Sequence, residues 1–289
     1  MNPPSISPNA AERGRLGVCS WSLQPASPAD LAAKIADCGL DAIQLALDPI
    51  RTGDWNEAET LRTLAAADIT ILSGMMACQG EDYSTLDTIK ATGGIRPDAT
   101  WPANLAAAKA NADLAARLGL SLVTLHAGFL PHNADNPERT KMLDRLAQLV
   151  EVFAQRTIRL AFETGQETAD TLLGVLAKLS ATSLSPGVNF DPANMILYNM
   201  GDPIAALCTL APHIAQLHIK DATAATTPGI WGSEVVVGKG GVDWEAFFAA
   251  YHDAGLSCDL VIEREAGNSR ILDVRTAAAR LQSSLDTTS

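Results

Sequence analysis

The feature that most constrains the fold is an eightfold alternation along the chain. Short apolar runs rich in Val, Ile and Leu alternate with Ala- and Leu-rich segments that have helical spacing. Nearly continuous apolar strands, each followed by a helix, are typical of a parallel sheet covered by helices. The expected strands are residues 16–22, 42–47, 70–77, 121–128, 159–164, 187–191, 214–221 and 259–263.

Helix start and stop signals lie between these runs. Residues 28–38 follow Ser27, begin at Pro28 and end before Gly39, which matches the preferences of helix termini. Comparable signals bound the segments 101–118, 136–155 and 244–254. Eight such units in 289 residues predict a single-domain α/β fold, a (β/α)8 TIM barrel. The competing fold, an open doubly wound sheet, usually carries GxGxxG after its first strand, and this chain does not.

The units extend over almost the whole chain. We expect residues 1–14 to form a disordered N-terminal tail and residues 15–289 to form the barrel. Two connections, residues 79–100 and 222–242, are longer than a barrel needs. Both follow the carboxyl ends of expected strands, where barrel active sites form, so we expect them to act as lids.

Composition excludes several classes of partner. The chain has 21 Lys and Arg against 33 Asp and Glu, a net charge of −12, which argues against a nucleic-acid partner. It has no run of about 18 apolar residues, so we expect no membrane-spanning helix. Its five cysteines are widely spaced and form no CxxC pair, which favours reduced thiols and a cytoplasmic location.

Polar side chains stand at the ends of the last four expected strands. They are Glu163, Asp191, His218 and Glu263. The carboxyl ends of successive barrel strands share one mouth, so these side chains can converge. Three carboxylates would repel one another without a cation, and together with an imidazole they suit one divalent metal ion: Mn, Co, Mg or Zn.

Two further residues belong to expected strand ends of the first half. His126 is either a substrate contact or a packed structural histidine. Trp21 is either an apolar wall for a sugar face or a filler of the barrel mouth.

Seven segments carry a resemblance to a known superfamily. They are LGVCSWS, LVTLHAG, FETGQE, FDPANM, LHIKDA, GKGGVDW and IEREAG. In this order they resemble the xylose isomerase-like TIM barrels, the sugar phosphate isomerase/epimerase group, from about residue 16 to 281. The resemblance to its tagatose/psicose 3-epimerase branch implies that Glu163, Asp191, His218 and Glu263 hold a metal. It also implies that Glu163 and Glu263 are the catalytic acid/base pair, and that the chain forms a dimer or tetramer.

The chain departs from that branch at two positions. Ala169 stands where the branch has a further glutamate, with Glu167 nearby, and Asn194 replaces a histidine three residues after Asp191. Gln166, Asn194 and Lys220 then become candidates for substrate contacts. Lys220 lies two residues after His218 and therefore on the same side of the strand. It binds a phosphate, neutralises an enolate, or is a rim lysine paired with Asp221.

The resemblance implies a divalent-metal-dependent isomerase or epimerase. The substrate would be a sugar, keto-sugar or cyclitol, and the reaction a proton transfer through an enediolate. The alternative is a metal-dependent dehydratase or lyase, similar to inosose dehydratase, because loss of a neighbouring hydroxyl can follow the same first step. A non-catalytic sugar-binding barrel is less favoured, and so is an AP endonuclease. The endonuclease's extra zinc-binding histidines are replaced here by Met75–Met76, Asn194 and residues 234–236.

Overall fold

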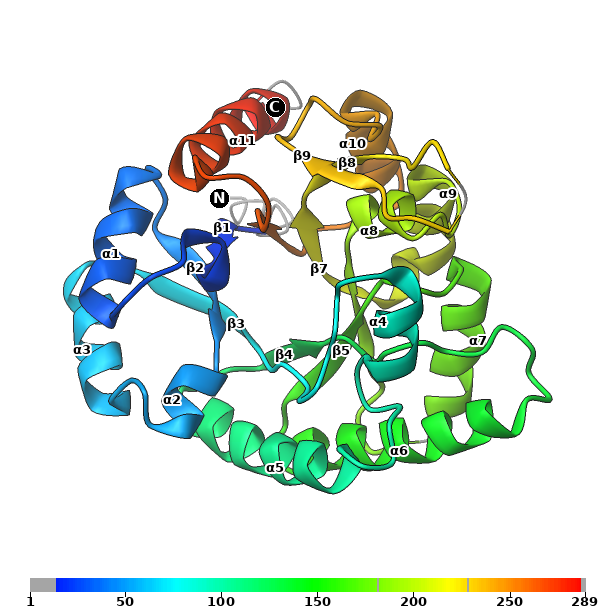
Figure 1. The fold of residues 1–289 in the computed structure, drawn as a ribbon. Coiled ribbons are helices and arrows are strands. Elements are labelled where there is room, and N and C mark those ends of the chain that lie inside the picture. Colours follow the sequence, from blue (N-terminus) through cyan, green and yellow to red (C-terminus); the bar gives the residue numbers. More distant parts are fainter. Residues whose placement is uncertain (1–13, 181, 228, 287–289) are drawn as a thin grey trace, which may run out of the picture.

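The barrel closes as predicted. A computed structural model describes residues 14–286 apart from 181 and 228, so the expected tail lies outside the described residues except for Gly14. Within them, eight parallel strands pair in the cyclic order β1-β10-β7-β6-β5-β4-β3-β2 (Figure 1). Their bounds are β1 Leu16–Cys19, β2 Ala42–Ala46, β3 Thr70–Met75, β4 Leu122–Leu125, β5 Arg159–Glu163, β6 Gly187–Phe190, β7 Ile214–Ile219 and β10 Asp259–Ile262.

The helices form a ring outside these strands (Figure 1). They are α1 Pro28–Asp37, α2 Asp48–Thr52, α3 Glu57–Ala66, α4 Leu86–Thr92, α5 Trp101–Arg117, α6 Pro137–Ala154, α7 Ala169–Leu179, α8 Pro192–Leu197, α9 Pro203–Leu210, α10 Trp244–Asp253 and α11 Arg270–Asp286. Two 3-10 helices, η1 Ser20–Leu23 and η2 Ala211–His213, complete them. No helix in the described part of the chain has the length and apolar character needed to cross a membrane.

The predicted helix starts are confirmed at the level of single caps. Ser27 accepts a hydrogen bond from the backbone N–H of Asp30, and Pro28 begins α1. Asn136 caps α6 in the same way, with Pro137 as its first residue. Each cap satisfies an N–H that the first helical turn leaves unpaired, so the sequence marks the start of the helix.

The strands are shorter than predicted, because the last polar residues of several apolar runs lie beyond the paired segment. Trp21 and Ser22 do not end a strand but lie in η1. The two long connections also contain structure that periodicity did not reveal. Residues 79–100 include α4, and residues 222–242 include β9 Ser233–Val235, which pairs with β8 Asp221–Thr223.

The interior of the barrel contains a buried polar network. Ser73 donates to Gln216, and the Gln216 amide donates to Asn189 Oδ1 at 3.1 Å. On the other side, Gln44 Nε2 donates to Thr124 Oγ1 at 2.8 Å. All five side chains are fully buried, so these hydrogen bonds offset the cost of keeping polar groups from water. The network forms the floor on which the mouth of the barrel is built.

Candidate metal centre

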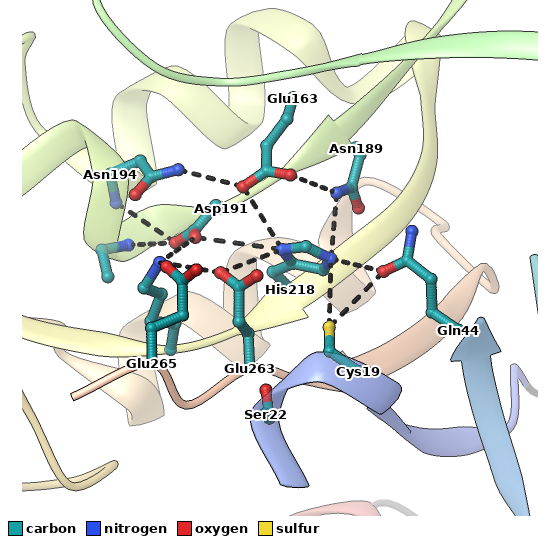
Figure 2. A network of polar contacts seen from close by, with 12 residues as sticks. Cys19, Ser22, Gln44, Glu163, Asn189, Asp191, Asn194, His218, Glu263 and Glu265 are labelled. Carbon is teal, nitrogen blue, oxygen red and sulfur yellow. Dashed lines mark hydrogen bonds and ion pairs between the residues drawn. The ribbon is translucent and has the colours of Figure 1, made fainter. Parts of the chain in front are cut away.

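The four predicted side chains converge at the carboxyl ends of β5, β6, β7 and β10 (Figure 2). One ligand atom from each of Glu163, Asp191, His218 and Glu263 lies within 4.8 Å of the others. His218 Nδ1 is 3.4 Å from Glu163 Oε1, 3.5 Å from Glu263 Oε2 and 4.0 Å from Asp191 Oδ2. All four residues are buried.

The ring of His218 is held by the polar floor. Its Nε2 lies 2.7 Å from Gln44 Oε1, which faces it because the Gln44 amide donates to Thr124. Burial opposes protonation of the ring, but the facing carboxylates hold the pKa of His218 well above its usual value. A bound divalent cation would displace the proton from Nδ1, whose lone pair would then face the three carboxylates while Nε2–H donates to Gln44. In the described residues, buried Nδ1 has no hydrogen-bond partner. A nitrogen lone pair among three carboxylate oxygens is a donor set that fits a divalent cation.

Asp191 is presented by the start of α8. It caps this helix, and its Oδ1 accepts the backbone N–H groups of Ala193 and Asn194 at 2.8 and 3.1 Å. Oδ2 stays buried and, among the described residues, without a hydrogen-bond partner. Burial and the neighbouring carboxylates raise the pKa of Asp191 to about 7, although Lys220 acts in the opposite direction. A bound cation would remove that conflict, which supports the same donor set.

Glu163 is held by two neutral amides. Asn189 Nδ2 donates to its Oε2 and Asn194 Nδ2 to its Oε1, each at 3.1 Å. Burial alone would raise the pKa of Glu163, but the facing imidazoles of His126 and His218 hold it below its usual value. The carboxylate is therefore ionised and fixed in one orientation.

Glu263 has a different set of neighbours. Trp21 Nε1 donates to its Oε1 at 2.8 Å, and Lys220 Nζ donates to its Oε2 at 2.7 Å. Burial opposes ionisation here too, yet Lys220 and His218 hold the pKa of Glu263 well below its usual value. The indole of Trp21 thus orients this carboxylate through its N–H, a contact that the prediction of an apolar wall did not include.

Lys220 is buried in the site and is not a rim lysine paired with Asp221. Its ammonium group contacts Glu263, Glu265 at 2.9 Å and Asp191 at 3.7 Å. Asp221 instead accepts hydrogen bonds from Trp244 and from backbone N–H groups of the glycine-rich loop. Neighbouring residues of an extended chain point to opposite sides, which separates the two side chains.

The remaining predicted residues lie on the β5 side of the centre. His126 Nε2 is 3.7 Å from Glu163 Oε2, and both line a cavity together with Gln166 and Glu167. Burial raises the pKa of Glu167 to about 7, against the opposing hydrogen bond from the backbone N–H of Gly165. The side-chain amide with which Asn194 donates to Glu163 is held in place by a second hydrogen bond, which it donates to the carbonyl oxygen of Thr164.

Several residues of the site were not predicted. Gln44 had a signal, since it is the one polar residue in the apolar run 42–47. Asn189 likewise interrupts an apolar run, whereas Glu265 and Tyr83 lie in loops where nothing marks them. Cys19 Sγ lies 3.6 Å from His218 Nε2. Its side chain is fully buried, which agrees with the apolar run around it.

Comparison with known proteins agrees with the fold. The family model described as "Xylose isomerase-like TIM barrel" matches residues 32–285. The uncharacterized protein YihM of Escherichia coli is 31% identical over 141 residues, which are 48% of this chain and 43% of YihM. A xylose isomerase domain protein of Planctomyces limnophilus has a TM-score of 0.82 at 28% identity and covers 94% of this chain and 96% of its own.

Three more distant structures share the fold at 17% identity. AsbF of Bacillus anthracis, a probable 3-DHS dehydratase, has a TM-score of 0.70 over 93% of this chain and 98% of its own. An L-ribulose 3-epimerase has a TM-score of 0.72 over 95% of each chain. A barrel protein from Mycobacterium smegmatis, solved with magnesium, has a TM-score of 0.70 over 96% and 98%. With the family model matched over most of its length, this chain belongs to the xylose isomerase-like TIM barrel family.

Proposed function

We propose that the protein is a divalent-metal-dependent isomerase or epimerase of a keto-sugar or cyclitol. The observation that carries the proposal is the unpartnered Nδ1 of His218 among three buried carboxylates. Glu163, Asp191, His218 and Glu263 would hold the ion. When bound, the ion would act as a Lewis acid that polarises the substrate carbonyl and stabilises the negative charge that develops on its oxygen. The L-ribulose 3-epimerase and the magnesium-containing barrel among its structural neighbours support this assignment.

Glu163 and Glu263 are the two groups that would move the proton. Both are ionised and each has one donor on each oxygen, so neither needs to reorient before accepting a proton. They come from β5 and from the end of β10, on different sides of His218 (Figure 2). One carboxylate would take the proton from the carbon beside the carbonyl, and the other would return a proton to the opposite face.

The other residues of the mouth would orient the sugar. His126 and Gln166 line the cavity beside Glu163, and Asn194 and Lys220 line a neighbouring cavity that His126 also borders. Imidazole, amide and ammonium groups are suited to hydroxyl and carbonyl oxygens. Trp21 lines the cavity next to Glu263, where its ring would shield the reacting carbon from water.

A dehydratase is the second candidate, and Glu167 is the observation that favours it. This carboxyl lines the same cavity as Glu163, and with its pKa raised to about 7 by burial it is partly protonated at neutral pH. A protonated carboxyl beside an enolate can donate to a departing hydroxyl. The resemblance to AsbF agrees with this alternative.

The first test is metal content together with proton exchange. Protein purified without added metal is measured by mass spectrometry for wild type and Glu263→Gln, and each is incubated with keto-sugars in D2O and followed by NMR. We expect about one divalent ion per chain in the wild type, its loss in the variant, and deuterium at the carbon beside the carbonyl in the wild type. Absence of metal from both proteins would contradict the proposal. A new enone absorbance would identify the dehydratase instead.

A further inference from the structure

Two adjoining chambers open beside the carboxylate cluster. The first has a volume of about 260 Å³ and is lined by Trp21, Met75, Met76 and Glu263. It contains one of the two proposed proton-transferring carboxylates and the indole that orients it. Glu163, the other carboxylate, lines a neighbouring cavity, and His126 lines both spaces. A reacting ring in the first chamber would therefore lie beside Glu263 and next to the cavity of Glu163.

The second chamber is larger and lies over the second half of the barrel. Its volume is about 360 Å³, within the range of pockets that bind small molecules, and it is lined by Leu197, Tyr198, Trp231 and Glu234. Asn194 and Lys220, already assigned to the reacting sugar, also line this chamber, but enolisation of a single sugar leaves Leu197, Tyr198, Trp231 and Glu234 without a role. A cavity of this size beside the reacting groups could hold a part of the ligand that extends beyond the reacting ring.

The two chambers adjoin. Tyr83, His126 and Glu265 line both of them, so these three residues form the boundary between the two compartments, here called the waist. Tyr83 belongs to the long connection after β3, and its ring meets that of His126 edge-on at 6.5 Å. A ligand of two linked rings would place its linkage at this waist.

The surface of the second chamber is aromatic on its faces and polar at its edge. The rings of Trp231 and Tyr198 pack edge to face, with centroids 4.9 Å apart. The Trp231 indole N–H is buried without a partner among the described residues, a donor that a ligand hydroxyl would satisfy. The adjoining Gly232 N–H donates to the carbonyl of Leu197, which fixes the loop on α8. Flat apolar faces beside carboxylates suit a pyranose, which has C–H faces and a rim of hydroxyls.

The charges of the cleft favour an uncharged ligand. Among the described residues that line either chamber, Lys220 is the one lysine or arginine. Its ammonium group already contacts Glu263 at 2.7 Å and Glu265 at 2.9 Å. No lysine or arginine among these lining residues is therefore free to bind a phosphate, and the carboxylates of Glu234 and Glu265 are themselves paired with Arg264 and Lys220.

We propose that the second chamber is a subsite for a second, uncharged pyranose ring, so that the substrate is a two-ring glycoside. The reacting keto ring lies in the first chamber, which rests on the proposed function, and the second ring packs on Trp231 and Tyr198. The class of reaction that supplies such a substrate is the oxidation of one ring hydroxyl of a disaccharide to a ketone.

Equilibrium binding tests the subsite without relying on turnover. Calorimetry with the protein as purified compares glucose with four disaccharides: cellobiose, maltose, trehalose and sucrose. We expect at least one disaccharide to bind ten-fold or more tightly than glucose. Affinities for all four within two-fold of that for glucose would overturn the proposal.

Two variants assign the preference to the second chamber. Trp231→Ala should abolish the preference, so that the affinities for the disaccharide and for glucose differ by less than two-fold, because it removes the stacking face. Leu197→Trp, which fills the chamber, should do the same and serves if the first variant does not fold. The control is Trp55→Ala, a half-buried tryptophan that lines neither chamber, which should retain the wild-type ratio. Retention of the preference in both chamber variants would reject the subsite.

The outcome separates this proposal from the proposed function. Deuterium exchange into a keto-sugar with equal affinities for glucose and the disaccharides would overturn the subsite alone. A clear disaccharide preference that Trp231→Ala abolishes, without exchange into any keto-sugar, would overturn the proposed reaction alone.

Discussion

At the scale of single residues, the two proposed catalytic carboxylates differ in what holds them. Glu163 is oriented by neutral amides from Asn189 and Asn194, whereas Glu263 has a cation, Lys220, on one oxygen and an indole N–H on the other. A cation stabilises the charged form of a carboxylate more strongly than an amide does. Glu163 is therefore the weaker acid of the two when protonated, and the better base when ionised.

This difference leads to a prediction for Glu163→Gln. The amide keeps the size of the side chain but cannot accept a proton from carbon, so turnover should fall more than ~100-fold, as for loss of a general base. Steady-state rates on the substrate identified by proton exchange provide the measurement. Glu245→Gln on the exposed face of α10 is the matched control and should retain wild-type turnover. Activity within ten-fold of wild type in Glu163→Gln would remove its assigned role.

At the scale of elements, the connection after β7 is organised by one buried carboxylate. Asp221 accepts hydrogen bonds from the backbone N–H groups of Gly238, Gly240 and Val242, and from Trp244 Nε1. A Cβ at Gly240 would lie 2.0 Å from Asp221 Oδ1, so only glycine fits at this close approach. The carboxylate therefore ties the hairpin β8–β9 to the start of α10, and with it the loop that carries Trp231.

We predict that Asp221→Ala is strongly destabilising. Four N–H groups, two buried and two partly buried, would lose their acceptor, and each buried one left without a partner costs about 1–3 kcal/mol. The free energy of unfolding, measured by urea titration, should fall by roughly 3 kcal/mol or more. Asp243→Ala, which removes only the exposed cap of α10, should cost about 1 kcal/mol. Equal effects of the two substitutions would show that the carboxylate does not organise the connection.

At the scale of the whole molecule, the four proposed ligands join strands that are far apart in the sequence. They lie on β5 and β7 and directly after β6 and β10, between residues 163 and 263, while Gln44 from β2 orients the central histidine. A ligand that binds only the closed barrel stabilises the folded state by mass action, by about 2.7 kcal/mol at one hundred times its dissociation constant. Metal binding and closure of the barrel are therefore coupled.

Thermal unfolding measures that coupling. For chains of 150–250 residues, each kcal/mol shifts Tm by about 2–4 °C, so saturating Mn²⁺ should raise the Tm of chelator-treated protein by roughly 5 °C. Glu263→Gln should show a much smaller rise, since it removes one charged ligand. The same Tm with and without Mn²⁺ for the wild type would argue against ion binding at these four strands.

The fold and the convergence of the four side chains were predictable because both follow from strand-level patterns. Eight apolar runs with polar ends suffice to place Glu163, Asp191, His218 and Glu263 at one mouth. One of the three alternatives for Lys220, the pair with Asp221, was wrong, although the alternation that aligned Lys220 with His218 also turns Asp221 away. That rule, applied consistently, would have excluded the pair.

Other features leave no trace in a single sequence. The floor of Gln44, Ser73, Thr124, Asn189 and Gln216 depends on which strands face each other across the barrel, which closure alone decides. Trp21 turns into η1, and its indole meets a residue 242 positions away. Periodicity describes neighbours along the chain, so contacts across the barrel mouth remain outside its reach.

The division of the cleft into two chambers has a consequence for how this scaffold can diversify. Trp231 and Tyr83 are carried by the long connections, whereas the proposed ligands belong to strand ends. A lineage can therefore exchange residues 79–100 or 222–242 and change what it recognises while its chemistry is inherited intact. The same separation offers a practical route to redesign, in which grafted connections supply new selectivity to an unaltered reaction centre.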